Sequence, residues 1–173
     1  QHLKPGVNYL GIKLDPEPDW HTYWHNPGDS GEAPVIEWQL SEGIAAGDIH
    51  WPIPKAIPVA HLVNYGYEGT NLLMVPVTVD EMFEASQATI TASLSWLVCK
   101  EDCIPGWADL SLTLPVQRNA SSPTNDAVLF EQTRSQLPDT ISNDVEHEVT
   151  DQHIVVSINN MQLIGDWRLL PFA

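Results

Sequence analysis

Short runs in which apolar and polar residues alternate fill the chain up to about residue 115. Thr89–Trp96 and Asp109–Leu114 alternate with a period of two, which is typical of a strand with one buried face. Stretches rich in Pro and Gly at residues 26–31 and 52–58 predict loops. The expected strands are Val7–Leu14, Trp20–His25, Val35–Leu40, Ala45–Trp51, Leu72–Val79, Ala88–Val98 and Trp107–Leu114. This pattern indicates an all-β fold, an antiparallel β-sandwich of immunoglobulin type without the inter-sheet disulfide of antibody domains.

The pattern changes after Pro115. Residues 119–124 are predicted to form a linker, and a helix is expected over Asp126–Gln136, capped by Asn125 or Thr124 and stopped by Pro138. One or two further strands are expected at Val145–Val149 and His153–Ile158. The predicted organisation is therefore a sandwich domain over residues 1–118, a linker and helix over 119–142, and a β segment over 143–173. That last segment either packs on the sandwich or begins a second domain.

Composition narrows the classes of function. The 173 residues carry seven Lys and Arg against 23 Asp and Glu, for a formal net charge of -16. Nucleic-acid binding and docking on anionic lipid both need clustered cations, so this charge argues against both. No apolar run approaches the roughly 20 residues that span a bilayer. The chain begins with Gln1-His2 and shows no signal-peptide pattern, so we expect a mature or excised segment.

Cys99 and Cys103 are the two cysteines of the chain and offer its most distinctive chemistry. On one extended strand they would lie roughly 13 Å apart, whereas a disulfide needs Cα atoms roughly 4.4–6.8 Å apart. Strands are expected on both sides of the pair, so Lys100-Glu101-Asp102 can form a three-residue hairpin loop that brings the cysteines together. The spacing therefore permits a disulfide if the pair lies at a turn.

Three uses of this pair are open: a structural disulfide, metal ligation and redox exchange. A ring this short removes little entropy from the unfolded chain, so a structural role gains least from it. Lys100 would lower the pKa of a neighbouring thiol, whereas Glu101 and Asp102 would raise it. This loop suits a carrier of reducing equivalents better than a strong oxidant. The motif is not thioredoxin-like, because three residues separate the cysteines and the surroundings are all-β.

Four stretches in order resemble a known family. They are WHTYWHNPGDSG (residues 20–31), IHWPIP (49–54), NYGYEG (64–69) and SWLVCKEDCIP (95–105). With these, residues 7–115 resemble the N-terminal periplasmic domain of DsbD-type transmembrane thiol:disulfide interchange proteins. The likeness is to the branch called suppressor of copper sensitivity protein B. The cysteine spacing is shorter than in the better-known members, and no Phe occurs between Gln1 and Met82.

The resemblance implies a periplasmic domain of an inner-membrane protein in a Gram-negative bacterium, active as a protein-disulfide reductase. Cys103 would attack the disulfide of a periplasmic thioredoxin-fold protein, and Cys99 would resolve the mixed disulfide. Reducing equivalents would come from membrane and C-terminal thioredoxin-like domains of the same polypeptide. No cofactor beyond the redox-active disulfide is expected. The resemblance also links the chain to copper tolerance and cytochrome c biogenesis.

Family members shield their cysteines with a cap loop and aromatic rings. The positions that match this role are Tyr23 and a predicted loop containing Asn64, Tyr65, Tyr67 and Glu68. Glu68 could act as a general base for Cys103, but we expect it to be an ordinary loop carboxylate.

A second hypothesis is a copper-binding or structural β-sandwich with an inert disulfide. His21 and His25 would share a face of an unbroken strand and, with Met74 or the cysteines, offer ligands that suit copper. We expect instead that these are strand-end histidines in solvent and that the chain holds no metal.

Overall fold

The computed structural model describes residues 2–118, 125–140 and 144–159, together with 142, 161, 168–170 and 172. The predicted linker at residues 119–124 lies outside this description. Two compact units are present, one ending at Leu137 and the other spanning Pro138–Phe172. The first unit therefore contains the helix as well as the sandwich.

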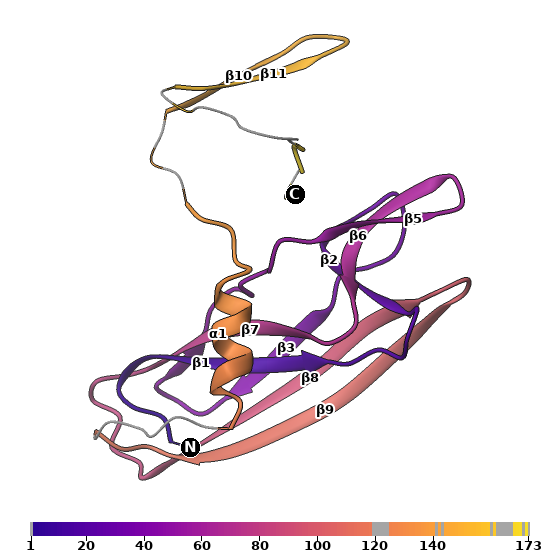
Figure 1. The fold of residues 1–173 in the computed structure, drawn as a ribbon. Helices are drawn as coiled ribbons and strands as arrows, with labels where there is room; N and C mark the ends of the chain where they lie inside the picture. The colour runs from indigo at the N-terminus through magenta and orange to yellow at the C-terminus, as the bar shows by residue number, and fades with distance from the viewer. Residues whose placement is uncertain are drawn as a thin grey trace. The chain divides into compact units, whose positions relative to one another are not determined.

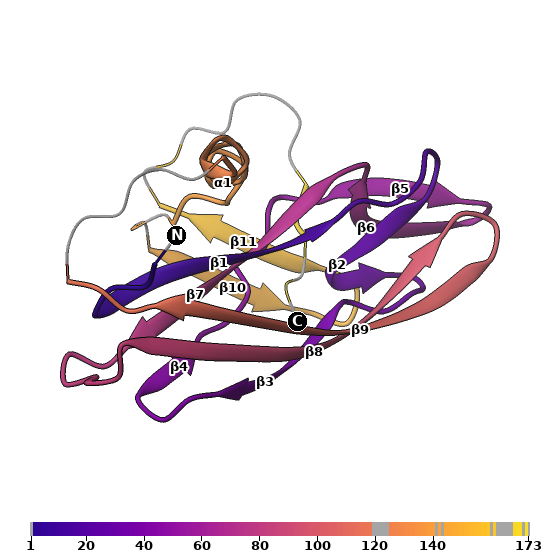
Figure 2. The ribbon, with the colours of Figure 1, turned by 90° about the horizontal axis from the view of Figure 1, so that it is seen from below.

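The first unit is an antiparallel, immunoglobulin-like β-sandwich, as the sequence predicts. One sheet has the strand order β1-β7-β4, and the other has the order β3-β8-β2-β6-β5 with β9 beside β8. Figure 1 shows the strands in place, and Figure 2 shows β8 and β9 side by side along their length. The bounds are β1 Gly6–Leu14, β2 His21–Gly28, β3 Val35–Leu40, β4 Ile44–Ala46, β5 Lys55–Val59, β6 Leu62–Glu68, β7 Asn71–Val79, β8 Gln87–Cys99 and β9 Cys103–Pro115.

Alternate residues of β7 and β8 build the core between the sheets. Val77 and Val79 of β7 pack with Ala88 and Ile90 of β8, and Leu3 joins them. Each of these side chains is almost fully buried. Removing such aliphatic groups from water stabilises the fold by roughly 1.5–3 kcal/mol per large side chain. This core fixes β8, and β8 in turn fixes the position of Cys99 at its end.

Two strands occupy segments that the sequence pattern assigned to loops. Residues 52–58 were expected to be a loop, yet β5 includes Pro58 and pairs with β6 alone. An edge strand can accept a residue that has no N–H to donate. The expected loop at Asn64–Glu68 is also wrong, because β6 pairs with β2 and β5. Gly66 permits that pairing, since a Cβ there would lie 2.0 Å from the carbonyl oxygen of Thr22.

Two further expectations need correction. The predicted strand Ala45–Trp51 is only three residues long in β4, and beyond it His50 forms an isolated bridge to Met74. The helix α1 (Ala127–Arg134) has Asp126 at its N-cap, not Asn125, and no side-chain cap bond forms. Asp126 itself has helical backbone angles, whereas a capping side chain normally needs an extended residue at that position.

Contacts with the β1-β7-β4 sheet hold α1 in the absence of a cap. Phe130 sits over Gly11, where a Cβ would lie 2.9 Å from the ring. The Arg134 guanidinium lies 5.0 Å from the centre of the Tyr9 ring, a cation–π contact. Helices this short are stable mainly through such packing. Figure 1 shows α1 lying across β1 and β7.

The second unit is built on one hairpin. Strands β10 (Val145–Val149) and β11 (Ile154–Ile158) pair antiparallel, close to the two predicted segments. The Thr150 hydroxyl donates to the carbonyl of His153, and the His153 N–H donates to the Thr150 hydroxyl oxygen. These bonds fix the turn. No helix in the described part of the chain is long and apolar enough to cross a membrane.

Candidate functional site

The two cysteines close a disulfide at the mouth of the β8–β9 hairpin. Cys99 ends β8, Cys103 begins β9, and the two are directly paired in the ladder. Their Cα atoms lie 4.2 Å apart, just below the usual range for disulfides. The Lys100 N–H donates to the Asp102 carbonyl across the three-residue loop. The chain reversal that the spacing required is therefore present.

The two sulfur-bearing residues differ in exposure. Cys99 is 3% exposed, whereas Cys103 lies at the surface. Lys100 in the loop does not act on the thiols as an isolated charge, because its Nζ lies 3.0 Å from Asp19 Oδ2 in an exposed ion pair. An incoming disulfide can reach Cys103 but not Cys99. The pair is thus chemically asymmetric before any reaction occurs.

Tyr23 joins Cys103 to a polar network in the centre of the sheet. The Tyr23 hydroxyl lies 3.7 Å from Cys103 Sγ, and Asn64 Nδ2 donates to the hydroxyl oxygen at 3.5 Å. In the disulfide the sulfur carries no proton, so the hydroxyl is the donor. Asn64 Oδ1 accepts from both the N–H and the hydroxyl of Ser30. Burial raises the pKa of Tyr23, and the Asn64 hydrogen bond opposes that change.

The turn at Gly28–Gly31 covers this network. Asp29 N–H donates to the Val63 carbonyl, and Val63 N–H donates back to Asp29 Oδ2 at 2.8 Å. Gly31 has φ of 95° and lies against the Tyr23 ring, where a Cβ would fall 2.1 Å from two ring carbons. Tyr23 is 1% exposed as a result. The turn that follows β2 therefore packs over the Tyr23 ring.

Strand alternation separates the other residues singled out from the sequence. Asn64 and Glu68 share one face of β6, whereas Tyr65 and Tyr67 lie on the opposite face. Tyr65 meets the Trp24 ring edge to face at 6.4 Å, and the Tyr67 hydroxyl donates to the Pro52 carbonyl at 2.8 Å. Burial strongly raises the pKa of Tyr67. Neither of these two interactions involves the disulfide.

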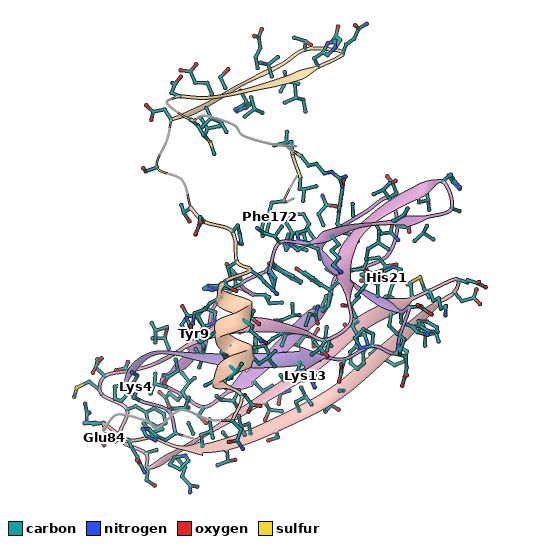
Figure 3. The ribbon with its side chains drawn as sticks, viewed as in Figure 1. Lys4, Tyr9, Lys13, His21, Glu84 and Phe172 are labelled. Carbon is teal, nitrogen blue, oxygen red and sulfur yellow. A yellow bond between two sulfur atoms is a disulfide. The ribbon has the colours of Figure 1, made fainter. Side chains whose placement is uncertain are left out.

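Four residues form a row across four strands at the disulfide end of the sheet. Cys103 of β9 is paired with Cys99 of β8, Cys99 with His21 of β2, and His21 with Glu68 of β6. Directly opposite residues of antiparallel strands point to the same face, with Cβ atoms roughly 4.5–5.5 Å apart. Figure 3 shows His21 at this end of the sheet. The sequence pattern named His21 with the cysteines only as possible copper ligands, and its place opposite Cys99 could not be predicted because the register between β2 and β8 is set by tertiary pairing.

His21 and His25 do not form a common site. The register of β2 against β6 shifts between Tyr23 and Gly28, so the unbroken strand required for a shared face is absent. His21 is 3% exposed and its ring lies 5.2 Å from that of Tyr23, whereas the His25 ring lies 5.7 Å from that of Trp51. Met74 is buried in the core. Among the described residues no group of three His, Cys, Asp or Glu could hold a metal ion.

A largely apolar groove of about 600 Å³ lies between the end of β1 and the β8–β9 hairpin. Its lining includes Val98 and Ile104, the sequence neighbours of the two cysteines, together with Asp15 and Glu17. Strand alternation turns Val98 and Ile104 to the face of the sheet opposite the disulfide. Trp107, which also lies on β9, is 73% exposed. This part of the surface offers apolar contacts edged by acidic groups.

Comparisons with known proteins agree with this geometry. The family model described as "Thiol:disulfide interchange protein DsbD, N-terminal" matches residues 2–115. The crystal structure of the N-terminal periplasmic domain of ScsB from Proteus mirabilis matches with a TM-score of 0.63 and 24% identity. The match covers 96% of this chain and 64% of the ScsB chain, so this chain spans less than two thirds of the length of the ScsB domain. At this identity the likeness supports the fold. No curated protein matches the chain.

Proposed function

Because the chain belongs to the family of DsbD N-terminal domains of thiol:disulfide interchange proteins, we propose that it is a protein-disulfide reductase module. Its Cys99/Cys103 couple cycles between dithiol and disulfide. The observation that carries the proposal is the closed disulfide with one exposed and one buried cysteine at a hairpin mouth. A ring of this size adds little to stability, so a structural role explains it poorly.

The exposure of the cysteines supports a division of roles. Cys103 thiolate attacks a sulfur of the partner's disulfide, which forms a mixed disulfide and releases one partner thiolate. Cys99 thiolate then attacks Cys103 Sγ, which closes the intramolecular disulfide and releases the second partner thiolate. Two electrons pass to the partner, and both of its thiolates take up protons. The sulfur that must meet the partner is the accessible one, and the resolving sulfur is the protected one.

The network behind Cys103 supports the first step. The Tyr23 hydroxyl can donate a hydrogen bond to the sulfur, and a hydrogen bond to the charged form of a thiol favours that form. Asn64 and the Gly28–Gly31 turn hold the ring in place. In this role Tyr23 and Asn64 support the site, whereas Tyr65 and Tyr67 stabilise the sheet around it.

The partner we propose is a thioredoxin-fold protein of the periplasm. Ile104 and Trp107, which follow Cys103 on β9, are exposed and suit contact with a protein better than with a small thiol. Glu101 and Asp102 of the loop and the net charge of -16 favour a partner with basic residues around its own active cysteine. The electrons would return from membrane and thioredoxin-like domains of the same polypeptide.

Trapping and redox titration test this function. A Cys99→Ser variant retains the attacking thiol and should accumulate a mixed disulfide with a periplasmic thioredoxin-fold protein, whereas Cys103→Ser should not. Equilibration of the wild-type chain with dithiothreitol should give a potential above about -300 mV, as exchanging disulfides have. A lower potential together with no trapped partner would overturn the proposal in favour of an inert disulfide.

A further inference from the structure

The row Cys103, Cys99, His21, Glu68 places a buried imidazole beside the resolving cysteine. His21 is the direct cross-strand partner of Cys99, and both are 3% exposed. In the described part of the chain its Nε2 is buried and makes no hydrogen bond. A buried polar atom without a partner destabilises the fold, so its presence here calls for a physical reason.

We propose that His21 is the proton acceptor for Cys99 in the resolution step, an inference that rests on the reductase function proposed above. The neutral imidazole takes the proton of the Cys99 thiol as Cys99 attacks the mixed disulfide on Cys103. The new disulfide forms, the partner's sulfur leaves as a thiolate, and that thiolate is protonated by water. His21 then returns its proton to solvent. In the reverse direction, His21 protonates Cys99 when the disulfide is opened.

Burial of Cys99 creates the need for such a group. A thiol in apolar surroundings resists ionisation, because the thiolate loses its hydration, and the thiolate is the attacking form. Cys103 is exposed to water and does not share this difficulty. A base is therefore needed at Cys99 rather than at Cys103, and His21 is the residue that the sheet places opposite it.

The groups around His21 suit a proton acceptor. Burial lowers the pKa of His21 and the charge of Glu68 raises it by less, so the ring is neutral at neutral pH and can accept a proton. Glu68 from β6 and Tyr23 from β2 are the other titratable groups in register or ring contact with it. Glu68 also pairs with Lys55 at 3.2 Å. A protonated His21 would find its counter-charge in Glu68.

The size of the effect follows from thiol ionisation. A thiol with an ordinary pKa of about 8.5 is roughly 3% thiolate at pH 7, and half-ionisation at that pH would raise the fraction about fifteenfold. A more acidic thiol is a weaker nucleophile, and this reduces the gain in rate by a factor of about five. Burial of Cys99 enlarges the benefit, so loss of His21 should slow resolution about three- to tenfold near pH 7.

The test separates the two chemical steps with the aromatic disulfide dithiobis(nitrobenzoate), whose released thiolate is coloured. The reduced full chain, in slight excess, should release one thiolate as Cys103 attacks and a second as Cys99 resolves. His21→Gln should slow the second release, leave the first unchanged, and lose its defect above about pH 9, where thiols ionise unaided. His25→Gln, on the same strand, should behave as wild type.

A second measurement does not depend on exchange. In the Cys103→Ser background, the ultraviolet absorbance of the Cys99 thiolate should titrate at higher pH after His21→Gln, and His21→Asn gives a second variant should the first misfold. An unchanged second step and unchanged Cys99 titration, or a defect equal at all pH values, would overturn the role of His21. A wild-type chain that releases no second thiolate would instead overturn the reductase function itself.

Discussion

The cover over Tyr23 can be tested by adding one methyl group at Gly31. Its φ of 95° is a conformation that side chains rarely adopt, and a Cβ there would lie 2.1 Å from two carbons of the Tyr23 ring. Gly69 provides the matched control, because it has φ of 71° and nothing within 4 Å of a Cβ. Gly69→Ala therefore carries the backbone cost alone, and Gly31→Ala carries the same kind of cost together with a clash.

The backbone cost at positive φ is about 1–2 kcal/mol. Overpacking against a ring that is 1% exposed adds about 1–3 kcal/mol, since Tyr23 is held by Asn64 and cannot move freely. Gly31→Ala should thus lower the free energy of unfolding by about 1–3 kcal/mol more than Gly69→Ala. Relief of the clash also displaces the Tyr23 ring, whose hydroxyl lies 3.7 Å from Cys103 Sγ, so the rate of disulfide reduction should change.

Urea denaturation of both oxidised variants measures the first effect, and the rate of disulfide reduction by dithiothreitol under native conditions measures the second. Equal destabilisation by the two substitutions would refute the argument that the turn rests on Tyr23. A clear difference in stability with identical reduction rates would refute the argument that the turn holds the Tyr23 hydroxyl at Cys103.

Three further outcomes are expected. Asn64→Ala leaves the Ser30 N–H and hydroxyl without their acceptor, so urea denaturation should show a loss of about 1–3 kcal/mol; a neutral result would mean that water replaces the bonds without cost. Because burial lowers the pKa of His21 below 6.5, the unfolded chain binds more protons. The free energy of unfolding should then fall as the pH drops through 6.5, by at most about 1.4 kcal/mol per pH unit from this group, until the folded-state pKa is reached. His21→Gln should flatten this part of the plot of unfolding free energy against pH. An unaltered slope would contradict the lowered pKa of His21. Reducing the Cys99–Cys103 bond opens a five-residue ring and should cost only about 2 kcal/mol, so near-ultraviolet circular dichroism should show the reduced chain still folded; global unfolding would argue for a structural disulfide.

Local patterns predicted the parts of the fold that depend on local physics. Alternation located β3 and β8 within a residue, because each has one buried face and the side-chain period of a strand is two. Strand β7 was located by its apolar run, since Leu72–Val75 are buried on both faces. Strand β6 escaped prediction because Asn64 and Gly66 are poor strand formers by themselves. Its two neighbours in the sheet supply the hydrogen bonds and the close approach to Thr22 that make this sequence a strand.

Local patterns were enough to predict the β-sandwich and a cysteine pair that closes across a three-residue loop, because strand period and loop length govern both; the family was indicated by four motifs in order. The exposure of each cysteine, the tyrosine that reaches Cys103 and the position of His21 opposite Cys99 came from the fold alone. These facts depend on register between strands distant in sequence. A shift of one residue would turn His21 to the other face of the sheet, and no local pattern encodes that choice.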